Sequence, residues 1–310
     1  MEGIIILLLA LAIDLVLGEF PPPIHPVVWM GKAISFLEGF APAHKRGAQL
    51  VYGAFMALMP IFIFALPVYF LLLYASKINL IVYLVLGALA LKSTFAFREL
   101  RQVAFEVKEL LTKDKIEEAR AMMSALVSRE NRSLGKPTLV SATVESVAEN
   151  TCDSFVAPLF YFLLLGVPGA VAYRAVNTID AMIGYHGKYE YLGKFAARLD
   201  DLLNFIPARL TALLLAIAAY LCRGDGKKAW RIMLRDHGKT ESPNAGWPMS
   251  AMAGALRMQL EKRDHYVLGD SNNPLSPQLI TAGIKLFNMS SLLWIILCLM
   301  TEITLFVLLT

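Results

Sequence analysis

Three acidic residues recur at every fourth position immediately before an apolar run. Glu145, Glu149 and Asp153 would therefore lie along one face of a helix. Carboxylates beside a membrane are costly unless a cation neutralises them. The spacing leaves two sources of that cation open: a magnesium ion carried by a nucleotide, or arginine side chains such as Arg174 and Arg198.

A second polar group lies between positions 173 and 206. It combines arginines, aspartates and asparagines at spacings that place them on helical faces. Guanidinium groups suit phosphates and carboxylates, whereas aspartates suit magnesium or an ammonium group. The group fits an anionic substrate with a metal, and it fits a salt-bridge network between helices equally well. Its members are Arg174, Asn177, Asp180, Tyr185, Arg198, Asp200, Asp201 and Asn204.

A third polar stretch, residues 235–246, precedes a helix of small residues at 249–256. Its glycines, proline and amide indicate a loop, and backbone N–H groups there could hold an anion. The start of a helix explains the turn residues about as well, but not the charges beside them. The candidate ligands are Arg235, Lys239, Ser242, Asn244 and Gly246.

Familiar motifs of soluble enzymes are missing from the sequence. Gly238-Lys239-Thr240 imitates the end of a P-loop, but Met233 stands where the first glycine should be, and no strand precedes it. Hydrolase, metalloprotease and dinucleotide fingerprints do not occur either. The five histidines and three cysteines are scattered, so we expect no zinc site. Residue types and spacing alone lead as far as a membrane enzyme or a transporter.

Membrane helices must position these groups. Of 310 residues, 57% are hydrophobic and 17% are charged, and the mean hydropathy is +0.56. A soluble domain of this length is less apolar and more charged. The net charge of +4 is small, and the basic residues lie in loops that suit an anionic lipid surface. Nucleic acid therefore finds no support as a partner.

Several apolar segments are long enough to cross a lipid bilayer, which takes about 20 residues. The clearest are residues 50–74, 80–97 and 286–309, while 4–17 and 208–222 are shorter. Only five residues separate the first two of these segments, which predicts a tight antiparallel hairpin.

A shorter apolar piece, residues 155–165, stops at Gly166-Val-Pro168-Gly. These residues break helices, so we predict a re-entrant hairpin near 155–172. Lysines and arginines gather in the long loops, which predicts that the loops face the cytoplasm. A crossing at 208–222 would place the basic loop 223–285 outside, so we expect that segment either to dip and return or to lie within a helix bundle.

The predicted fold is all-α, with about 4–6 membrane segments and large polar loops on one side. We expect a single integral-membrane domain over residues 1–310 of a multi-pass protein in the cell (cytoplasmic) membrane. Within it, residues 98–154 would be a soluble helical region, and residues 173–206 and 223–285 would be cytoplasmic loops that carry the motifs.

Motifs of one known family recur along nearly the whole chain. They are Asp14-Leu-Val-Leu-Gly-Glu19, His25-Pro-Val27, Met30-Gly31, Glu145-Ser-Val-Ala-Glu-Asn-Thr151, Ala157-Pro-Leu-Phe160, Tyr173-Arg-Ala-Val-Asn-Thr-Ile-Asp180, Gly184-Tyr185, Ala197-Arg-Leu-Asp-Asp-Leu202, Asn204, Pro207-Ala-Arg-Leu-Thr211, Ser242-Pro-Asn-Ala-Gly246 and Ala251-Met-Ala-Gly-Ala-Leu256. Together they closely resemble the adenosylcobinamide-phosphate synthase family of cobalamin biosynthesis. The chain departs from that pattern at Ser154, at Met249 and at Thr240. We therefore give positions 240 and 249 no catalytic role, and Asp236 and His237 receive no assigned role.

The resemblance implies an amide ligation that depends on ATP and magnesium. A propionate carboxylate of the corrinoid adenosylcobyric acid would condense with (R)-1-aminopropan-2-ol phosphate, or with free aminopropanol in some pathway variants, through an acyl phosphate. Partners would include a threonine-phosphate decarboxylase, other late enzymes of the pathway and the lipid bilayer.

The resemblance also suggests roles for the candidate residues. Catalysis would rest on Asp180, Arg198, Asp200 and Asp201, and magnesium on Glu145, Glu149 and Asp153. Substrates and nucleotide would bind Arg174, Asn177, Tyr185, Asn204, Arg209, Arg235, Lys239, Ser242, Asn244 and Gly246. The turn at 242–246 could hold either the nucleotide or the aminopropanol phosphate, and the sequence does not choose between them.

Two other functions fit the same scaffold. A related membrane sensor would have lost the polar motifs, which survive here. A corrinoid transporter shares re-entrant hairpins with this chain, but it would need more secure spans and would not require amide formation.

Overall fold

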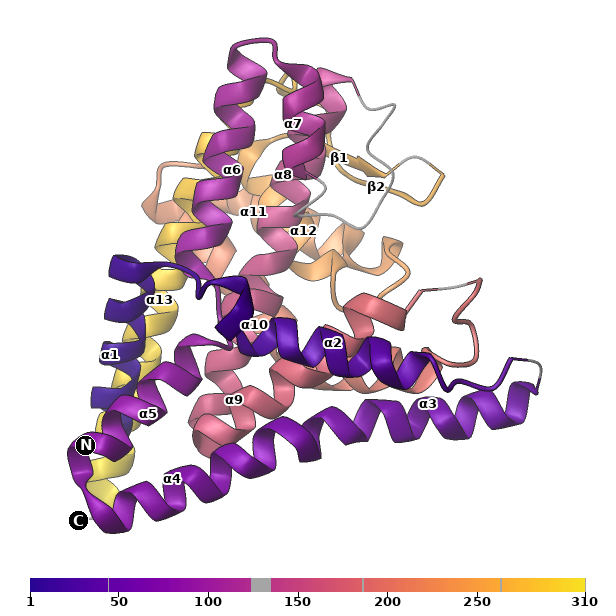
Figure 1. Ribbon diagram of the computed structural model, residues 1–310. Helices are drawn as coiled ribbons and strands as arrows, with labels where there is room; N and C mark the ends of the chain where they lie inside the picture. Colours follow the sequence, from indigo (N-terminus) through magenta and orange to yellow (C-terminus); the bar gives the residue numbers. More distant parts are fainter. Residues whose placement is uncertain (44, 124–134, 186, 263, 310) are drawn as a thin grey trace. The chain divides into compact units, whose positions relative to one another are not determined.

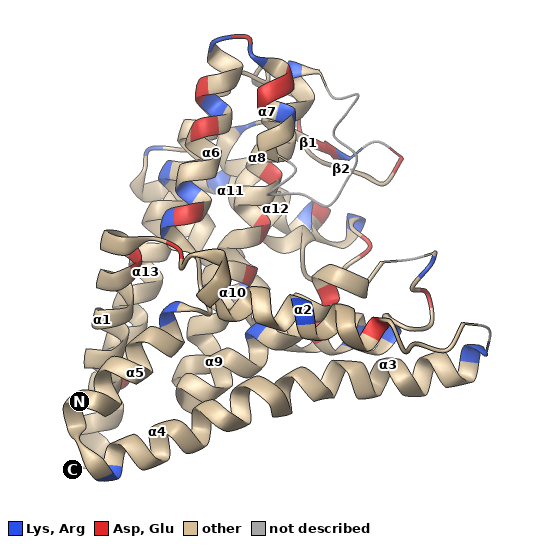
Figure 2. Cartoon of the chain, viewed as in Figure 1, with Lys and Arg blue, Asp and Glu red and all other residues tan. Residues whose placement is uncertain are grey.

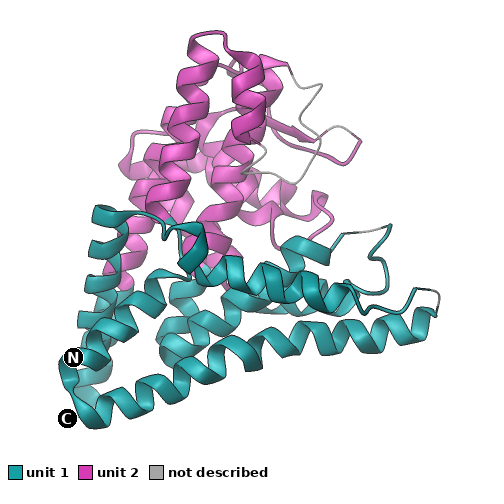
Figure 3. Cartoon of the chain, in the orientation of Figure 1, with its two compact units in different colours: residues 1–96, 157–204, 298–310 teal, residues 97–156, 205–297 magenta. Residues whose placement is uncertain are grey.

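The structure, a computed structural model, describes residues 1–43, 45–123, 135–185, 187–262 and 264–309 (Figure 1). These residues form two compact units, each assembled from separate stretches of chain (Figure 3). Unit 1 comprises residues 1–96, 157–204 and 298–310, and unit 2 comprises residues 97–156 and 205–297.

Helices make up nearly all of unit 1. It contains α1 (Glu2–Leu17), η1 (Pro22–Ile24), α2 (Pro26–Glu38), α3 (Arg46–Pro60), the π-helix η2 (Ile61–Ala65), α4 (Leu66–Ile78), α5 (Leu80–Lys92), α9 (Ala157–Ile183), the start of α10 (Lys194–Leu221) and the end of α13 (Pro277–Leu309).

Unit 2 is also mainly helical. It contains α6 (Phe97–Thr112), α7 (Ile116–Met123), α8 (Lys136–Thr151), the π-helix η3 (Cys152–Val156), the remainder of α10, α11 (Gly226–Asp236), the 3-10 helix η4 (His237–Lys239), α12 (Gly246–Leu256), strands β1 (Gln259–Lys262) and β2 (Tyr266–Gly269), and the start of α13. The strands pair antiparallel, with Leu260 opposite Leu268. This small hairpin is absent from the sequence prediction, because each strand has only four residues, but the fold remains essentially all-α.

Among the residues that the structure describes, five segments are long and apolar enough to cross a membrane. They are Arg46–Ile78, Leu80–Thr112, Lys136–Ile183, Lys194–Leu221 and Pro277–Leu308. Charged side chains are sparse along α1 and α4 and frequent along α6 and α7 (Figure 2). The predicted all-α, polytopic membrane fold is confirmed.

The predicted turn between two apolar segments lies at Asn79, between α4 and α5. Its side-chain Oδ1 accepts hydrogen bonds from the backbone N–H groups of Ile81 (2.8 Å) and Val82 (3.3 Å). An asparagine at this position satisfies donors that the first turn of a helix otherwise leaves unpaired. The two helices pack against each other, so the predicted helical hairpin is confirmed.

The chain folds back on itself within α9. Gly166 has φ 68° and ψ −165°, a conformation that interrupts the helix. The rings of Tyr161 and Tyr173 stack with centroids 5.3 Å apart, although twelve residues of straight helix would separate them by about 18 Å. A Cβ at Gly169 would lie 2.7 Å from the Tyr161 carbonyl oxygen, so the two arms meet where glycine leaves room. The predicted hairpin near 155–172 is confirmed.

Of the two alternatives for residues 208–222, a segment that dips and returns is excluded, because α10 is one helix from Lys194 to Leu221. Pro207 lies inside it and cannot donate to the carbonyl of Leu203, four residues earlier. The Tyr161 hydroxyl donates to that carbonyl instead, at 2.9 Å. A side chain from α9 thus satisfies the group that proline leaves free, and the helix continues.

Candidate functional site

A chain of hydrogen bonds joins α9 to the start of α10 in unit 1. The Tyr173 hydroxyl donates to Asn204 Oδ1 (2.9 Å), and Asn204 Nδ2 donates to Asp200 Oδ2 (2.9 Å). Asn177 Nδ2 donates to Asp200 Oδ1 at 3.4 Å, and Arg174 donates to Asn177 Oδ1 at 3.3 Å. Four of the predicted site residues therefore belong to one network, to which the structure adds Tyr173.

The acid in this network is held in one orientation. Asp200 is 9% exposed, Asn204 is 2% exposed and Tyr173 is 1% exposed. Both oxygens of Asp200 accept hydrogen bonds from amides on two helices. A buried carboxylate fixed in this way is preorganised to orient a polar substrate group.

Other members of the second polar group lie outside these hydrogen bonds. The side chain of Arg198 is 75% exposed and lies 3.7 Å from Asp201. Tyr185 is 46% exposed at the end of α9. The Asp180 carboxylate lies beside Gly184, where an added Cβ would approach Asp180 Oδ1 to 2.0 Å.

Arg209 is the centre of a polar and aromatic group in unit 2. Its guanidinium donates to the Phe205 carbonyl (2.7 Å) and to Asn244 Oδ1 (3.0 Å). It also lies 3.7 Å from the centre of the Phe205 ring and 4.9 Å from that of Trp247. A guanidinium group held between aromatic rings still has N–H donors that can bind an anion. The predicted ligands Arg209 and Asn244 therefore meet, and Trp247 joins them.

Arg235 and Lys239 share another partner in unit 2, the fully buried Asp236. The Arg235 Nε atom lies 2.8 Å from Asp236 Oδ1, and Lys239 Nζ lies 2.6 Å from the same oxygen. The Gly269 N–H donates to Asp236 Oδ2 at 2.8 Å, and Arg235 also pairs with Asp270 at 2.9 Å. Burial by itself raises the pKa of Asp236, but these partners outweigh it and lower that pKa to about 2.

The turn at 242–246 is shaped by contacts within unit 2. The backbone N–H of Asn244 donates to Ser242 Oγ at 3.2 Å. A Cβ at Gly246 would lie 2.0 Å from the His237 carbonyl oxygen, so glycine is required where α12 begins. These contacts explain Ser242 and Gly246 without a ligand, whereas the Asn244 side chain faces Arg209.

The described residues contain no group of three or more His, Cys, Asp or Glu side chains placed to hold a metal ion. The expectation of one three-carboxylate cluster is therefore not met. Glu145 and Glu149 lie on α8, but Asp153 lies in the π-helix η3. The wider turn of a π-helix means that a spacing of four residues no longer keeps side chains on one face. Magnesium that arrives with a nucleotide needs only one or two protein carboxylates beside its phosphates. The buried Glu145 and half-buried Glu149 suit that smaller role.

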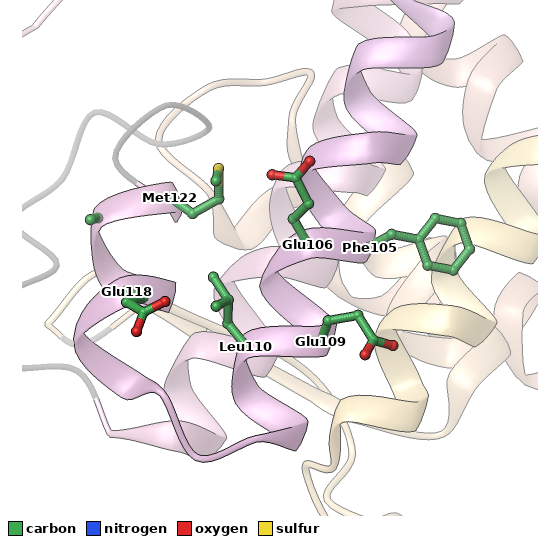
Figure 4. A pocket seen from close by; sticks show the side chains of 7 residues that line it. Phe105, Glu106, Glu109, Leu110, Glu118 and Met122 are labelled. Carbon is green, nitrogen blue, oxygen red and sulfur yellow. The ribbon is translucent and has the colours of Figure 1, made fainter.

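A hollow of about 660 Å³ lies between α6 and α7. Leu110 and Met122 line it together with carboxylates, as Figure 4 shows. Two of these carboxylates, Glu109 and Glu118, pair with neighbouring lysines. None of the predicted site residues lines this hollow, so we do not assign the chemistry to it.

A protein-family model covers most of the chain. The model of the CobD/Cbib protein family matches residues 7–287, which include all three polar groups. This chain belongs to the CobD/Cbib family.

Curated relatives in the family cover nearly the same length. The chain is 52% identical to the cobalamin biosynthesis protein CobD of Dehalococcoides mccartyi, over 96% of each chain. It is 40% identical to a probable CobD of Methanothermobacter thermautotrophicus, over 95% of this chain and 96% of the relative. It is also 45% identical to a probable CobD of Pyrococcus furiosus, over 83% and 85%. No solved structure matches the chain. Membership in this family makes the chain a cobalamin biosynthesis protein, and its long apolar helices make it a multi-pass membrane protein.

A further polar cluster of this CobD/Cbib protein has no place among the predicted site residues. Lys92 is fully buried and lies 3.1 Å from Asp14 and 2.8 Å from Glu19, whose other oxygen is 2.8 Å from His25 Nε2. Burial opposes ionisation of Glu19, but the hydrogen bonds from His25 and Lys92 lower its pKa. The signal for this cluster was a single lysine inside an apolar run, where an ionisable residue always needs a partner.

Proposed function

We propose that this CobD/Cbib protein is adenosylcobinamide-phosphate synthase, an ATP- and magnesium-dependent amide ligase. It would join a carboxylate of adenosylcobyric acid to the amine of (R)-1-aminopropan-2-ol phosphate. Two side chains carry the proposal. In unit 1, Asp200 is a buried carboxylate held in one orientation. In unit 2, Arg209 is a guanidinium group held between aromatic rings. A ligase of this type must hold both polar and phosphorylated substrates.

The chemistry requires activation, because a carboxylate does not react with an amine at neutral pH. ATP would supply a phosphoryl group that converts the carboxylate into an acyl phosphate, with charge neutralised by magnesium and arginine. Arg174 and Arg209 would bind phosphate oxygens, since a guanidinium offers two parallel donors. Glu145 and Glu149 would hold magnesium together with the nucleotide phosphates.

Unit 1 would orient a substrate through its hydrogen-bonded network. Asp200 accepts hydrogen bonds from Asn177 and Asn204, and the second hydrogen of the Asn177 amide could donate to a ligand. Arg198 and Asp201 stay in the proposal as an exposed arginine beside a partly buried acid, and Asp180 as a further acid on α9.

The setting is a cell membrane with the polar segments on its cytoplasmic side. Positive charge in those segments supports this orientation. The amine would come from a threonine-phosphate decarboxylase, and the product would pass to later enzymes of the pathway.

The test is reconstitution of the detergent-purified protein with adenosylcobyric acid, aminopropanol phosphate, ATP and magnesium. Mass spectrometry should reveal an amide product that disappears when ATP, magnesium or the amine is omitted. Asp200→Asn should lower turnover by about 10²–10³-fold, as expected when a preorganised group is lost, whereas Lys115→Gln, at an exposed position just before α7, should not change it. Corrinoid binding by folded wild-type protein without turnover would refute the ligase and favour a sensor or transporter.

A further inference from the structure

His237 follows α11 directly and occupies the 3-10 helix η4. Its Nδ1 atom lies 3.1 Å from the carbonyl oxygen of Met233. A carbonyl oxygen only accepts hydrogen bonds, so Nδ1 must carry a hydrogen. In the neutral imidazole, Nε2 then has the lone pair. This atom makes no hydrogen bond to any residue that the structure describes.

The imidazole ring belongs to the same group as the proposed phosphate ligands. It stacks on the Trp247 ring with centroids 4.0 Å apart and an angle of 32° between planes. The Arg209 guanidinium lies 4.9 Å from that same tryptophan ring and donates to Asn244. A proton acceptor is therefore held beside a cation and an amide that suit a phosphate.

The charged side chains near His237 in the sequence form ion pairs with each other. Asp236 precedes it in the chain, but its carboxylate accepts from Arg235 and Lys239 and from the Gly269 N–H. Arg209 is the remaining charged group in contact with the Trp247 stack. Because Asp236 and its two cations bind each other, none of them occupies Nε2 of His237, and this atom can act as a base.

We infer that His237 accepts the proton that the substrate amine must lose, and that this group holds the amino-alcohol phosphate and not the nucleotide. The inference rests on the proposed function and deepens it. Phosphoryl transfer to a carboxylate needs no proton acceptor, because the carboxylate is already deprotonated. Amide formation does need one. A base beside phosphate-binding residues therefore points to a ligand that carries both a phosphate and an amine.

The bonds and protons of the step balance. The amine nitrogen attacks the carbonyl carbon of the acyl phosphate, and a C–N bond forms. The C–O bond to phosphate breaks, and its electron pair leaves with the phosphate. The nitrogen, which arrives as an ammonium, loses one proton before attack and one after it. Nε2 of His237 accepts each proton in turn and passes it to water.

Two variants separate the base from the other contacts of His237. His237→Asn keeps a donor toward the Met233 carbonyl, and His237→Phe keeps an aromatic ring on Trp247. Both should lower kcat about 10²–10⁴-fold, which is the usual contribution of a general base, with little change in the KM for the amine. His265→Asn is the matched control, because His265 pairs with Glu241 at the surface.

Near-wild-type kcat in folded His237→Asn or His237→Phe would overturn the inference. A wild-type protein that forms no amide would instead refute the proposed function. The identity of the ligand is tested by calorimetric titration with aminopropanol phosphate and with a non-hydrolysable ATP analogue. Asn244→Leu should weaken binding of the first and spare the second, and the opposite pattern would make this group the nucleotide site.

Discussion

The substitution Asp236→Asn would keep the size of a buried side chain and remove the negative charge that Arg235, Lys239 and the Gly269 N–H bind. Removal of one partner from a buried ion pair costs about 3–5 kcal/mol. Here both cations are nearly half exposed, so water screens part of the interaction. The structure therefore favours a loss below that range.

The acid titration of Asp236 gives a second measure of the same interaction. Its pKa is about 2 in the folded protein against an ordinary 3.8, and a tenfold change in an equilibrium constant is worth about 1.4 kcal/mol. The ionised group therefore contributes about 2 kcal/mol to the free energy of unfolding. Because the folded-state pKa is the lower one, this contribution is complete above pH 3.8 and disappears as the pH falls towards 2.

The assay is thermal unfolding of the purified protein in detergent, followed by fluorescence from pH 7 down to pH 2. Asp236→Asn should lower the midpoint by a few degrees at pH 7, and its loss of stability between pH 4 and pH 2 should be shallower than that of the wild type. Lys108→Gln on α6 removes an exposed ion pair and serves as the control. Equal midpoints for Asp236→Asn and the wild type at pH 7 would refute the assignment.

Three further substitutions test packing and buried charge. Gly246→Ala should destabilise unit 2 by about 1–3 kcal/mol, because its Cβ would meet the His237 carbonyl oxygen; an unchanged thermal midpoint would contradict this. Lys92→Met should cost about 3–5 kcal/mol, since it leaves buried carboxylates without their cation, and the yield of monodisperse protein should fall. Tyr161→Phe should cost about 1 kcal/mol through the lost hydrogen bond to the Leu203 carbonyl. Replacement of the proline in α10 by alanine should abolish that cost, and a double-mutant cycle measures the difference.

Local signals predicted the parts of the fold that depend on neighbouring residues. The breaker sequence that begins at Gly166 predicted the hairpin in α9, and its φ of 68° explains the reversal. Asn79 predicted the turn between α4 and α5. The continuity of α10 through Pro207 depends on a hydroxyl from another helix. No pattern within α10 announces such a donor, and the expectation of a returning segment rested on the charge of the loop that follows.

The candidate site also has features that local spacing predicts and features that it does not. Spacing correctly placed Asn177, Asp200 and Asn204 on helical faces that meet. It also suggested that Glu145 and Asp153 share a face, but a π-helix turn intervenes. A π-helix differs from an α-helix by one inserted residue, and the apolar pattern of the segment does not reveal that insertion.

The cationic stretch before α12 shows what residue type alone leaves out of a ligand prediction. Arg235 and Lys239 suggested an anion site because arginine and lysine bind phosphates in many proteins. A buried aspartate between them, Asp236, accepts both charges. A residue without an assigned role, His237, is left beside Trp247 with an available nitrogen. A cation that already forms an ion pair with a neighbouring acid is a weaker candidate for binding a ligand. A ligand prediction from sequence should therefore first ask which acids lie near each lysine and arginine.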